Sequence, residues 1–122
     1  MSEEIENIPL DEYPVQIVPG KFALLKAKTL YKFQNDNKTD GRWLAICKCE
    51  STFMKRDNTE GKALSIRIYR WQWRQVTKWD PDQRKRIPTS EYRWFQEQQT
   101  NLSRKDYWDK IKNVVDEYMK EI

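Results

Sequence analysis

The chain of 122 residues contains no histidine, three glycines and two cysteines. Without histidine it cannot form a Ser-His or Cys-His pair, and it lacks the commonest general base of enzymes. The glycines are too scattered for a phosphate-binding loop of the Walker or GxGxxG type. These absences predict a protein that is not an enzyme and that uses neither a cofactor nor a metal ion.

The cysteines and the hydropathy of the chain indicate the cellular compartment in which the protein is expected. Cys47 and Cys49 lie two residues apart in an expected strand, a spacing at which disulfides are rare, and two thiolates do not complete a zinc site. We interpret both as small core residues in a reducing environment. No apolar run is long enough to span a membrane, and the first residues lack a secretory signal pattern. The sequence therefore predicts a cytoplasmic protein without a membrane partner.

Basic residues and tryptophans are concentrated in one third of the chain. Between Lys62 and Trp94 there are nine basic residues against three acidic ones, together with four of the six tryptophans. Residues 1–20 instead contain five acidic residues and no basic one. We expect this acidic segment to be a weakly ordered lead-in to a single domain over residues 21–122. An alternative is that it folds over the basic surface of that domain.

Three strands are expected, over residues 22–33, 42–53 and 65–74, the last with an extension through residue 79 as an alternative. The first strand alternates apolar residues with lysines, and the second carries apolar residues on both faces, as central strands do. In the third strand one face is apolar, whereas the other combines arginine with aromatic rings. The residues of this second face are Arg67, Tyr69, Trp71 and Trp73.

After Pro88 the pattern becomes helical. Thr89 or Ser90 can cap a helix through about residue 99, and Ser103 can begin a second helix. The second helix carries an apolar stripe that we expect to pack against the sheet, with a homodimer seam as the alternative. The stripe consists of Trp108, Ile111, Val115, Tyr118, Met119 and Ile122.

These patterns predict an α+β fold, in which a twisted antiparallel sheet of three to five strands has two C-terminal helices packed on one face. The expected order of elements over residues 22–122 is similar to that of the single-strand binders that include the Whirly and PUR proteins. The similarity concerns topology alone, and no residue role is transferred from it.

The coincidence of basic charge and aromatic rings predicts the function. Guanidinium groups neutralise phosphates, and aromatic rings stack on unpaired bases. We therefore expect non-catalytic binding of single-stranded nucleic acid, DNA or RNA, through a basic and aromatic face of the sheet. The expected contact residues are Lys26, Lys28, Trp43, Arg67, Tyr69, Arg70, Trp71, Trp73, Arg74, Arg84, Lys85 and Arg86.

Three alternatives stay open. The aromatic residues of the third strand can instead be ordinary core. A protein-interaction module, such as a small cellular or viral regulator or inhibitor, could use the same Trp, Tyr and Arg surface, because these residues dominate protein interfaces. Finally, Asp40 followed by Glu60-Gly61-Lys62 resembles the metal-binding core of restriction-type nucleases, which hold such an acid pair on adjacent strands.

Overall fold

The computed structural model describes residues 8–122. Four strands form one antiparallel sheet in the order β1-β2-β3-β4, so that each strand pairs with its neighbour in the sequence. The predicted antiparallel sheet is confirmed. The elements are η1 (Leu10–Glu12), β1 (Phe22–Gln34), β2 (Gly41–Met54), β3 (Glu60–Asp80), β4 (Lys85–Leu102) and α2 (Lys105–Met119).

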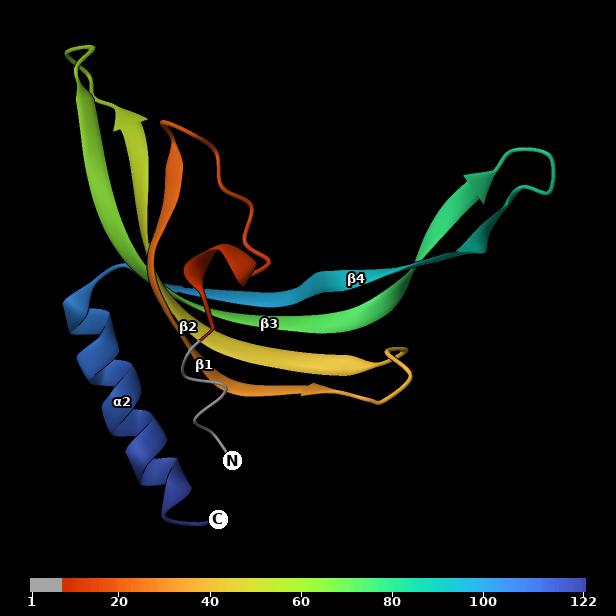
Figure 1. Cartoon of the computed structure of the whole chain (residues 1–122). Coiled ribbons are helices and arrows are strands. Elements are labelled where there is room, and N and C mark those ends of the chain that lie inside the picture. Colours follow the sequence, from red (N-terminus) through yellow and green to blue (C-terminus); the bar gives the residue numbers. More distant parts are fainter. Residues whose placement is uncertain (1–7) are drawn as a thin grey trace.

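The sheet is bent, and the hairpin of β3 and β4 extends beyond the other two strands (Figure 1). The pairing of β2 with β3 ends at Gly41 and Trp73, whereas β3 continues to Asp80 against β4. Residues 74–93 are therefore a two-stranded arm joined by the turn after Asp80, and we call them the arm. The extension of the third strand beyond residue 74, which the sequence left open, is present.

The expected helix over residues 89–99 is wrong, because these residues lie in β4. Tyr92 and Trp94 share one face of the sheet, and Arg93 and Phe95 share the other, which is the periodicity of a strand. An extra residue at Glu97 then shifts this alternation to the other face. The uninterrupted run of alternating residues is therefore too short to be recognised in the sequence. The chain consequently has one C-terminal helix, α2, instead of two.

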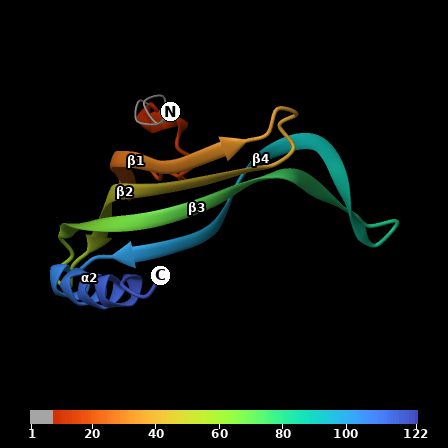
Figure 2. The ribbon, with the colours of Figure 1, turned by 90° about the horizontal axis from the view of Figure 1, so that it is seen from below.

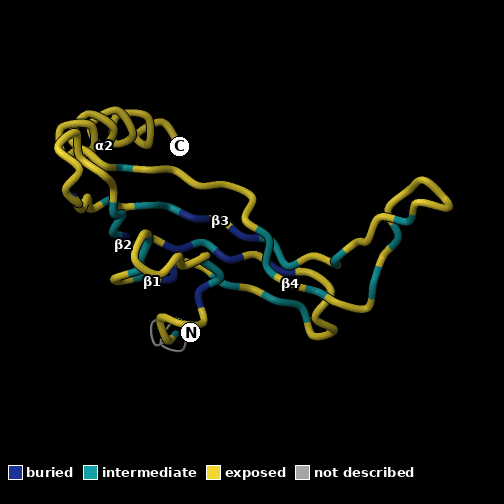
Figure 3. The backbone as a smooth tube through the Cα atoms, turned by 90° about the horizontal axis from the view of Figure 1, so that it is seen from above, coloured by how far each residue is buried: buried dark blue, intermediate teal, exposed yellow. Residues whose placement is uncertain are grey.

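The core lies on one face of the sheet, which we call the aromatic face. Its buried residues come from the centres of β1, β2 and β3 (Figure 3). Trp43 stands opposite Trp71, and Ala45 stands opposite Tyr69, so cross-strand pairs of β2 and β3 build the centre of this core. The buried members are Thr29, Trp43, Ala45, Cys47, Cys49, Tyr69 and Trp71.

The segment before β1 covers this core. Tyr13 is buried, with its ring centroid 5.1 Å from that of Trp43. The Tyr13 hydroxyl lies 2.9 Å from the Thr29 hydroxyl, which also accepts a hydrogen bond from the Trp43 indole N–H at 2.9 Å. Tyr13, Ile8 and Val15 therefore pack on the core, whereas most other described residues of this segment are exposed. The expected weakly ordered lead-in over residues 1–20 stays a prediction, and residues 1–7 lie outside the described part. Val18 forms an isolated bridge to Phe22.

Both cysteines belong to the core, as expected. Cys47 and Cys49 are fully buried and unbonded. Burial raises the pKa of the Cys47 thiol to about 12 and also raises the pKa of the Cys49 thiol. Over residues 8–122 no helix is long and apolar enough to cross a membrane.

The C-terminal helix lies beside β4, and η1 lies beside β1, at opposite margins of the sheet (Figure 2). No residue of α2 is buried. Its apolar side chains form a stripe that remains 42–97 % exposed, so the expected packing of this stripe against the sheet is absent. We call this surface the helix stripe; it consists of Tyr107, Trp108, Ile111, Val114, Val115, Tyr118, Met119 and Ile122.

Candidate nucleic-acid interface

The three aromatic residues expected to stack on bases are part of the core. Trp43, Tyr69 and Trp71 are only 1 %, 2 % and 0 % exposed. Their rings pack on one another, with the Tyr69 and Trp71 centroids 5.2 Å apart in a stacked pair. These side chains cannot reach a base in this arrangement, nor can they form the contact surface of a protein partner. The interpretation of these rings as ordinary core is the one that the structure bears out.

Two further expected contact residues, Trp73 and Arg67, also lie on the aromatic face. Trp73 is half-buried, and its indole N–H donates to the backbone carbonyl oxygen of Lys38 at 2.8 Å. Arg67 holds its guanidinium 4.6 Å from the ring centroid of Phe22 and donates a weak hydrogen bond to the Tyr69 hydroxyl. Both side chains therefore have structural partners.

Basic side chains gather on the opposite face of the sheet. In the strand register, Lys28 stands opposite Ile46, and Leu44 stands opposite Arg70, so that all of these lie on one side. Four carboxylates of the described residues pair with them, from Asp40, Glu50, Glu91 and Glu97. We call this surface the basic face; its basic residues are Lys26, Lys28, Arg42, Lys48, Lys62, Arg70, Arg74 and Arg93.

The lysines of β1 do not all share this face. Register shifts lie between Leu24 and Lys26 and between Thr29 and Tyr31. The second shift turns Lys32 to the aromatic face, where its ammonium group lies 4.1 Å from the Trp43 ring centroid. Burial there lowers the pKa of Lys32, against the opposing effect of Glu12. The predicted lysine face is thus correct for Lys26 and Lys28 but not for Lys32.

Like charges stand directly opposite each other at two places on the basic face. Lys26 pairs with Lys48 across β1 and β2, and Arg74 pairs with Arg93 across β3 and β4. Such pairs destabilise a sheet, whereas opposite charges at the same positions would stabilise it. At these two places the basic face is therefore not arranged for the stability of the isolated chain.

The arginine pair on the arm surrounds an aromatic ring. The guanidinium carbon of Arg74 lies 4.6 Å from the ring centroid of Phe95, and that of Arg93 lies 5.8 Å from it. Arg93 also contacts Glu91 at 3.3 Å, which neutralises only part of the local charge. Together with Arg86 they line an open hollow of about 430 Å³. A hollow with three guanidinium groups suits a phosphate.

The expected basic cluster Arg84-Lys85-Arg86 lies at the tip of the arm. Arg86 donates to the Thr77 hydroxyl at 2.6 Å and to its carbonyl oxygen at 2.8 Å, so its side chain is fixed beside the hollow. Lys85 stands opposite Asp80. Arg84 adopts a backbone φ of 53° in the turn and is exposed. Of the three, Arg86 therefore joins Arg74 and Arg93 at the hollow, whereas Lys85 and Arg84 do not line it.

Exposed aromatic rings accompany the basic face where β1 meets β2. Tyr31 and Phe33 are 51 % and 46 % exposed, and they stand opposite Leu44 and Arg42. Sequence reasoning missed them because the register shift in β1 changes which face they occupy. It also missed Arg42 and Lys48, although their even-numbered positions in β2 were visible. Arg93 and Phe95 were hidden by the wrong helix assignment.

The acidic residues suggested for a nuclease site are not brought together. Asp40 precedes Gly41 at the start of β2, whereas Glu60 stands opposite Met54 at its end. The two carboxylates therefore lie at opposite ends of a 14-residue strand. Among residues 8–122, no group of three or more acidic, cysteine or histidine side chains is placed to hold a metal ion.

Comparison with known proteins identifies no relative. No family model, no curated protein and no solved structure matches the chain significantly.

Proposed function

We propose that the protein binds single-stranded nucleic acid, DNA or RNA, without catalysing a reaction, and that the strand lies on the basic face. The observation that carries this proposal is the cross-strand pair of Arg74 and Arg93 beside Phe95. A phosphate between the two guanidinium groups would convert a repulsive pair into two favourable contacts. Lys26 and Lys48 provide a second place of the same kind.

Exposed rings on the same face support a single strand over a duplex. Tyr31 and Phe33 offer faces on which unpaired bases can stack, at roughly 1–3 kcal/mol per base. Duplex readers more often place a basic helix in the major groove. The helix α2 has nearly balanced charge and an apolar stripe, so it does not suit that role. We also propose an intracellular, reducing location, which the two unbonded thiols support.

Fluorescence anisotropy of labelled oligothymidine and oligouridine tests the proposal at two salt concentrations. We expect tight binding at low salt and a steep loss at higher salt, because phosphate contacts release counterions. Arg74→Ala/Arg93→Ala should weaken binding to all sequences and lower the slope of log K against log salt by about 2, about 1 for each lost cation. Tyr31→Ala/Phe33→Ala should weaken binding without changing that slope.

The matched control is Lys55→Ala/Arg56→Ala, which removes two charges from the turn between β2 and β3, away from the arm. This control should retain most of the binding. Equal losses in the control and in the arginine variant would show that binding reflects net charge alone. If neither oligonucleotide binds at low salt, the proposed function is wrong.

A further inference from the structure

The helix stripe has no partner within the part of the chain that the structure describes. Trp108, Ile111 and Val115 follow one another at steps of three and four residues, yet they are 42–44 % exposed. Tyr118 and Met119 are 66 % and 59 % exposed. An apolar stripe of this length normally lies against another element, because its burial is what stabilises a short helix.

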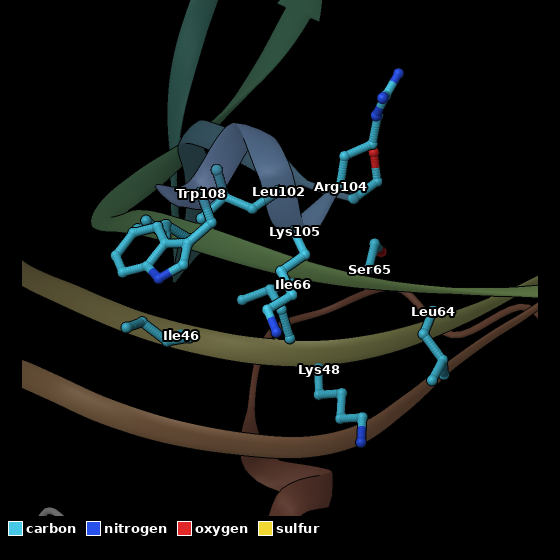
Figure 4. A pocket seen from close by; sticks show the side chains of 11 residues that line it. Ile46, Lys48, Leu64, Ser65, Ile66, Leu102, Arg104, Lys105 and Trp108 are labelled. Atoms are coloured by element: carbon cyan, nitrogen blue, oxygen red, sulfur yellow. The ribbon is translucent and has the colours of Figure 1, made fainter. Parts of the chain in front are cut away.

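An apolar groove adjoins the first turn of this helix. Trp108 from α2 and Ile46, Leu64 and Ile66 from the strands line it (Figure 4). The groove encloses about 470 Å³, and Leu64 and Ile66 remain 52 % and 38 % exposed in it. It lies at the α2 end of the basic face, where Lys48 also lines it, whereas the arm with Arg74 and Arg93 is outside it. The groove and the helix stripe therefore form one continuous apolar surface, of a size that typically marks an interaction site.

We propose that this surface binds a second copy of the chain, with the two α2 helices antiparallel. The distribution of charge along α2 favours a second, antiparallel copy as the partner of this surface. From Arg104 to Lys112 there are four basic and two acidic residues, whereas from Asp116 to Glu121 there are three acidic residues and one basic. In an antiparallel pair each basic half lies against the acidic half of its partner, whereas a parallel pair would place like halves together.

Helical spacing fixes the register of this pairing. At 100° per residue, Lys110 and Glu117 flank the helix stripe on one side, and Lys112 and Asp116 flank it on the other. A twofold axis near Val114 places Lys110 beside Glu117 of the second copy. The same axis places Lys112 beside Asp116 of the second copy. Both flanks give the same axis, so charge and geometry agree.

The same register brings the apolar surfaces together. Trp108 lies beside Tyr118 and Met119 of the second copy, and Ile122 of the second copy reaches the first turn of α2. This turn borders the apolar groove, so the last turn of each helix fills the groove of the other copy. The eight partly exposed side chains offer on the order of 800 Å² per copy, which matches one side of an interface of standard size.

Sedimentation equilibrium of the full chain is the first test. We expect a mass twice the 14.9 kDa of one chain. Ile111→Lys places a charge in the middle of the helix stripe and should shift the protein to monomer. Asn113→Lys adds the same side chain on the opposite side of the helix and should leave the dimer intact. Circular dichroism confirms that both variants fold. A wild-type protein that is monomeric at high concentration would overturn the proposal.

Charge exchange tests the antiparallel register. Lys110→Glu/Lys112→Glu makes both halves acidic, and Asp116→Lys/Glu117→Lys makes both halves basic. For each variant alone, the dissociation constant of the dimer should rise by about tenfold or more, because each of these interhelical charge pairs becomes repulsive. A mixture of the two should form a heterodimer in preference to either homodimer, and the chain that carries all four changes should dimerise like the wild type.

The mixing experiment separates contacts between chains from those within one helix. Lys112 also pairs with Asp116 of its own chain at 2.9 Å, so a reversal on one side weakens the helix itself. Mixing does not repair that internal pair, and a heterodimer therefore reports contacts between copies. If each charge variant keeps the wild-type dimer constant, the helices are not antiparallel and the proposed register is wrong.

Discussion

The two faces of the sheet use the same kinds of side chain for opposite purposes. On the aromatic face, Trp43 and Trp71 are buried beneath Tyr13. On the basic face, Tyr31 and Phe33 remain about half exposed beside arginines and lysines. On the first face the Thr29 hydroxyl and the Trp43 indole N–H are hydrogen-bonded to each other, whereas the second face places like charges opposite each other.

This difference shows that the residue types alone do not locate a binding surface. An Arg next to a Trp in the sequence points to the other side of the strand, so a stretch such as Arg70-Trp71 divides between core and surface. The aromatic face carries stability, and the basic face is available for a ligand. Substitutions on the two faces should therefore act on different quantities.

The largest effect is expected at Trp71. Trp71→Ala should lower the free energy of unfolding by about 3–5 kcal/mol, because it leaves a cavity at the centre of the aromatic face. Trp71→Phe should cost much less, since among the described residues the Trp71 indole N–H is buried without a hydrogen-bond partner. Urea denaturation measures both. The control, Trp79→Ala on the exposed arm, should change stability by less than about 0.5 kcal/mol.

The hydroxyl of Thr29 should have the next largest effect. Thr29→Val removes the shared partner of the Tyr13 hydroxyl and the Trp43 indole N–H. With two buried polar groups unsatisfied, unfolding should become easier by roughly 2–4 kcal/mol. Thr29→Ser keeps the acceptor and should lose less than half as much in the same denaturation experiment. Val keeps the methyl group and Ser keeps the hydroxyl, so equal losses would mean that the hydroxyl contributes no more to stability than the methyl group.

The strands were predictable from the sequence where alternation is regular. In β2 the odd-numbered positions are buried without interruption from Trp43 to Cys49, and the sequence predicted this strand as central. The alternation fails in β1 and β4, because register shifts there move later side chains to the other face. A single sequence does not reveal such shifts, since they depend on pairing with a neighbouring strand.

The candidate site was predictable only in part for the same reason. Lys26, Lys28, Arg70 and Arg74 share the basic face, as their even-numbered positions suggested. The rings chosen for stacking were wrong, because the choice between buried and exposed aromatic residues depends on what covers the sheet. That cover includes Tyr13, which lies 30 residues before Trp43 in a segment that resembled an acidic tail.

The buried thiols predict a loss of stability at high pH. The pKa of Cys47 is raised to about 12 in the folded state, against about 8.5 in an unfolded chain. Between these values the unfolded chain releases a proton that the folded chain keeps. Stability therefore decreases as pH rises, by about 1.4 kcal/mol per pH unit for this thiol. Denaturation at pH 8, 9 and 10 should show a shallower decrease for Cys47→Ala than for the wild type. Parallel decreases would contradict the role of this thiol.

The smallest expected effect on stability is the sharpest test of the basic face, because its sign is opposite to that of the others. Lys26→Glu turns the repulsive pair with Lys48 into an attractive one, so the free energy of unfolding should rise by about 0.2–1 kcal/mol. The same change should weaken binding of oligothymidine. Lys55→Glu alters the net charge equally in the turn between β2 and β3 and should change neither quantity.

A variant that gains stability and loses binding shows that the like-charge pair exists for the ligand. If Lys26→Glu changes stability alone, with binding intact, this part of the face is ordinary solvated surface and the nucleic acid lies along the arm.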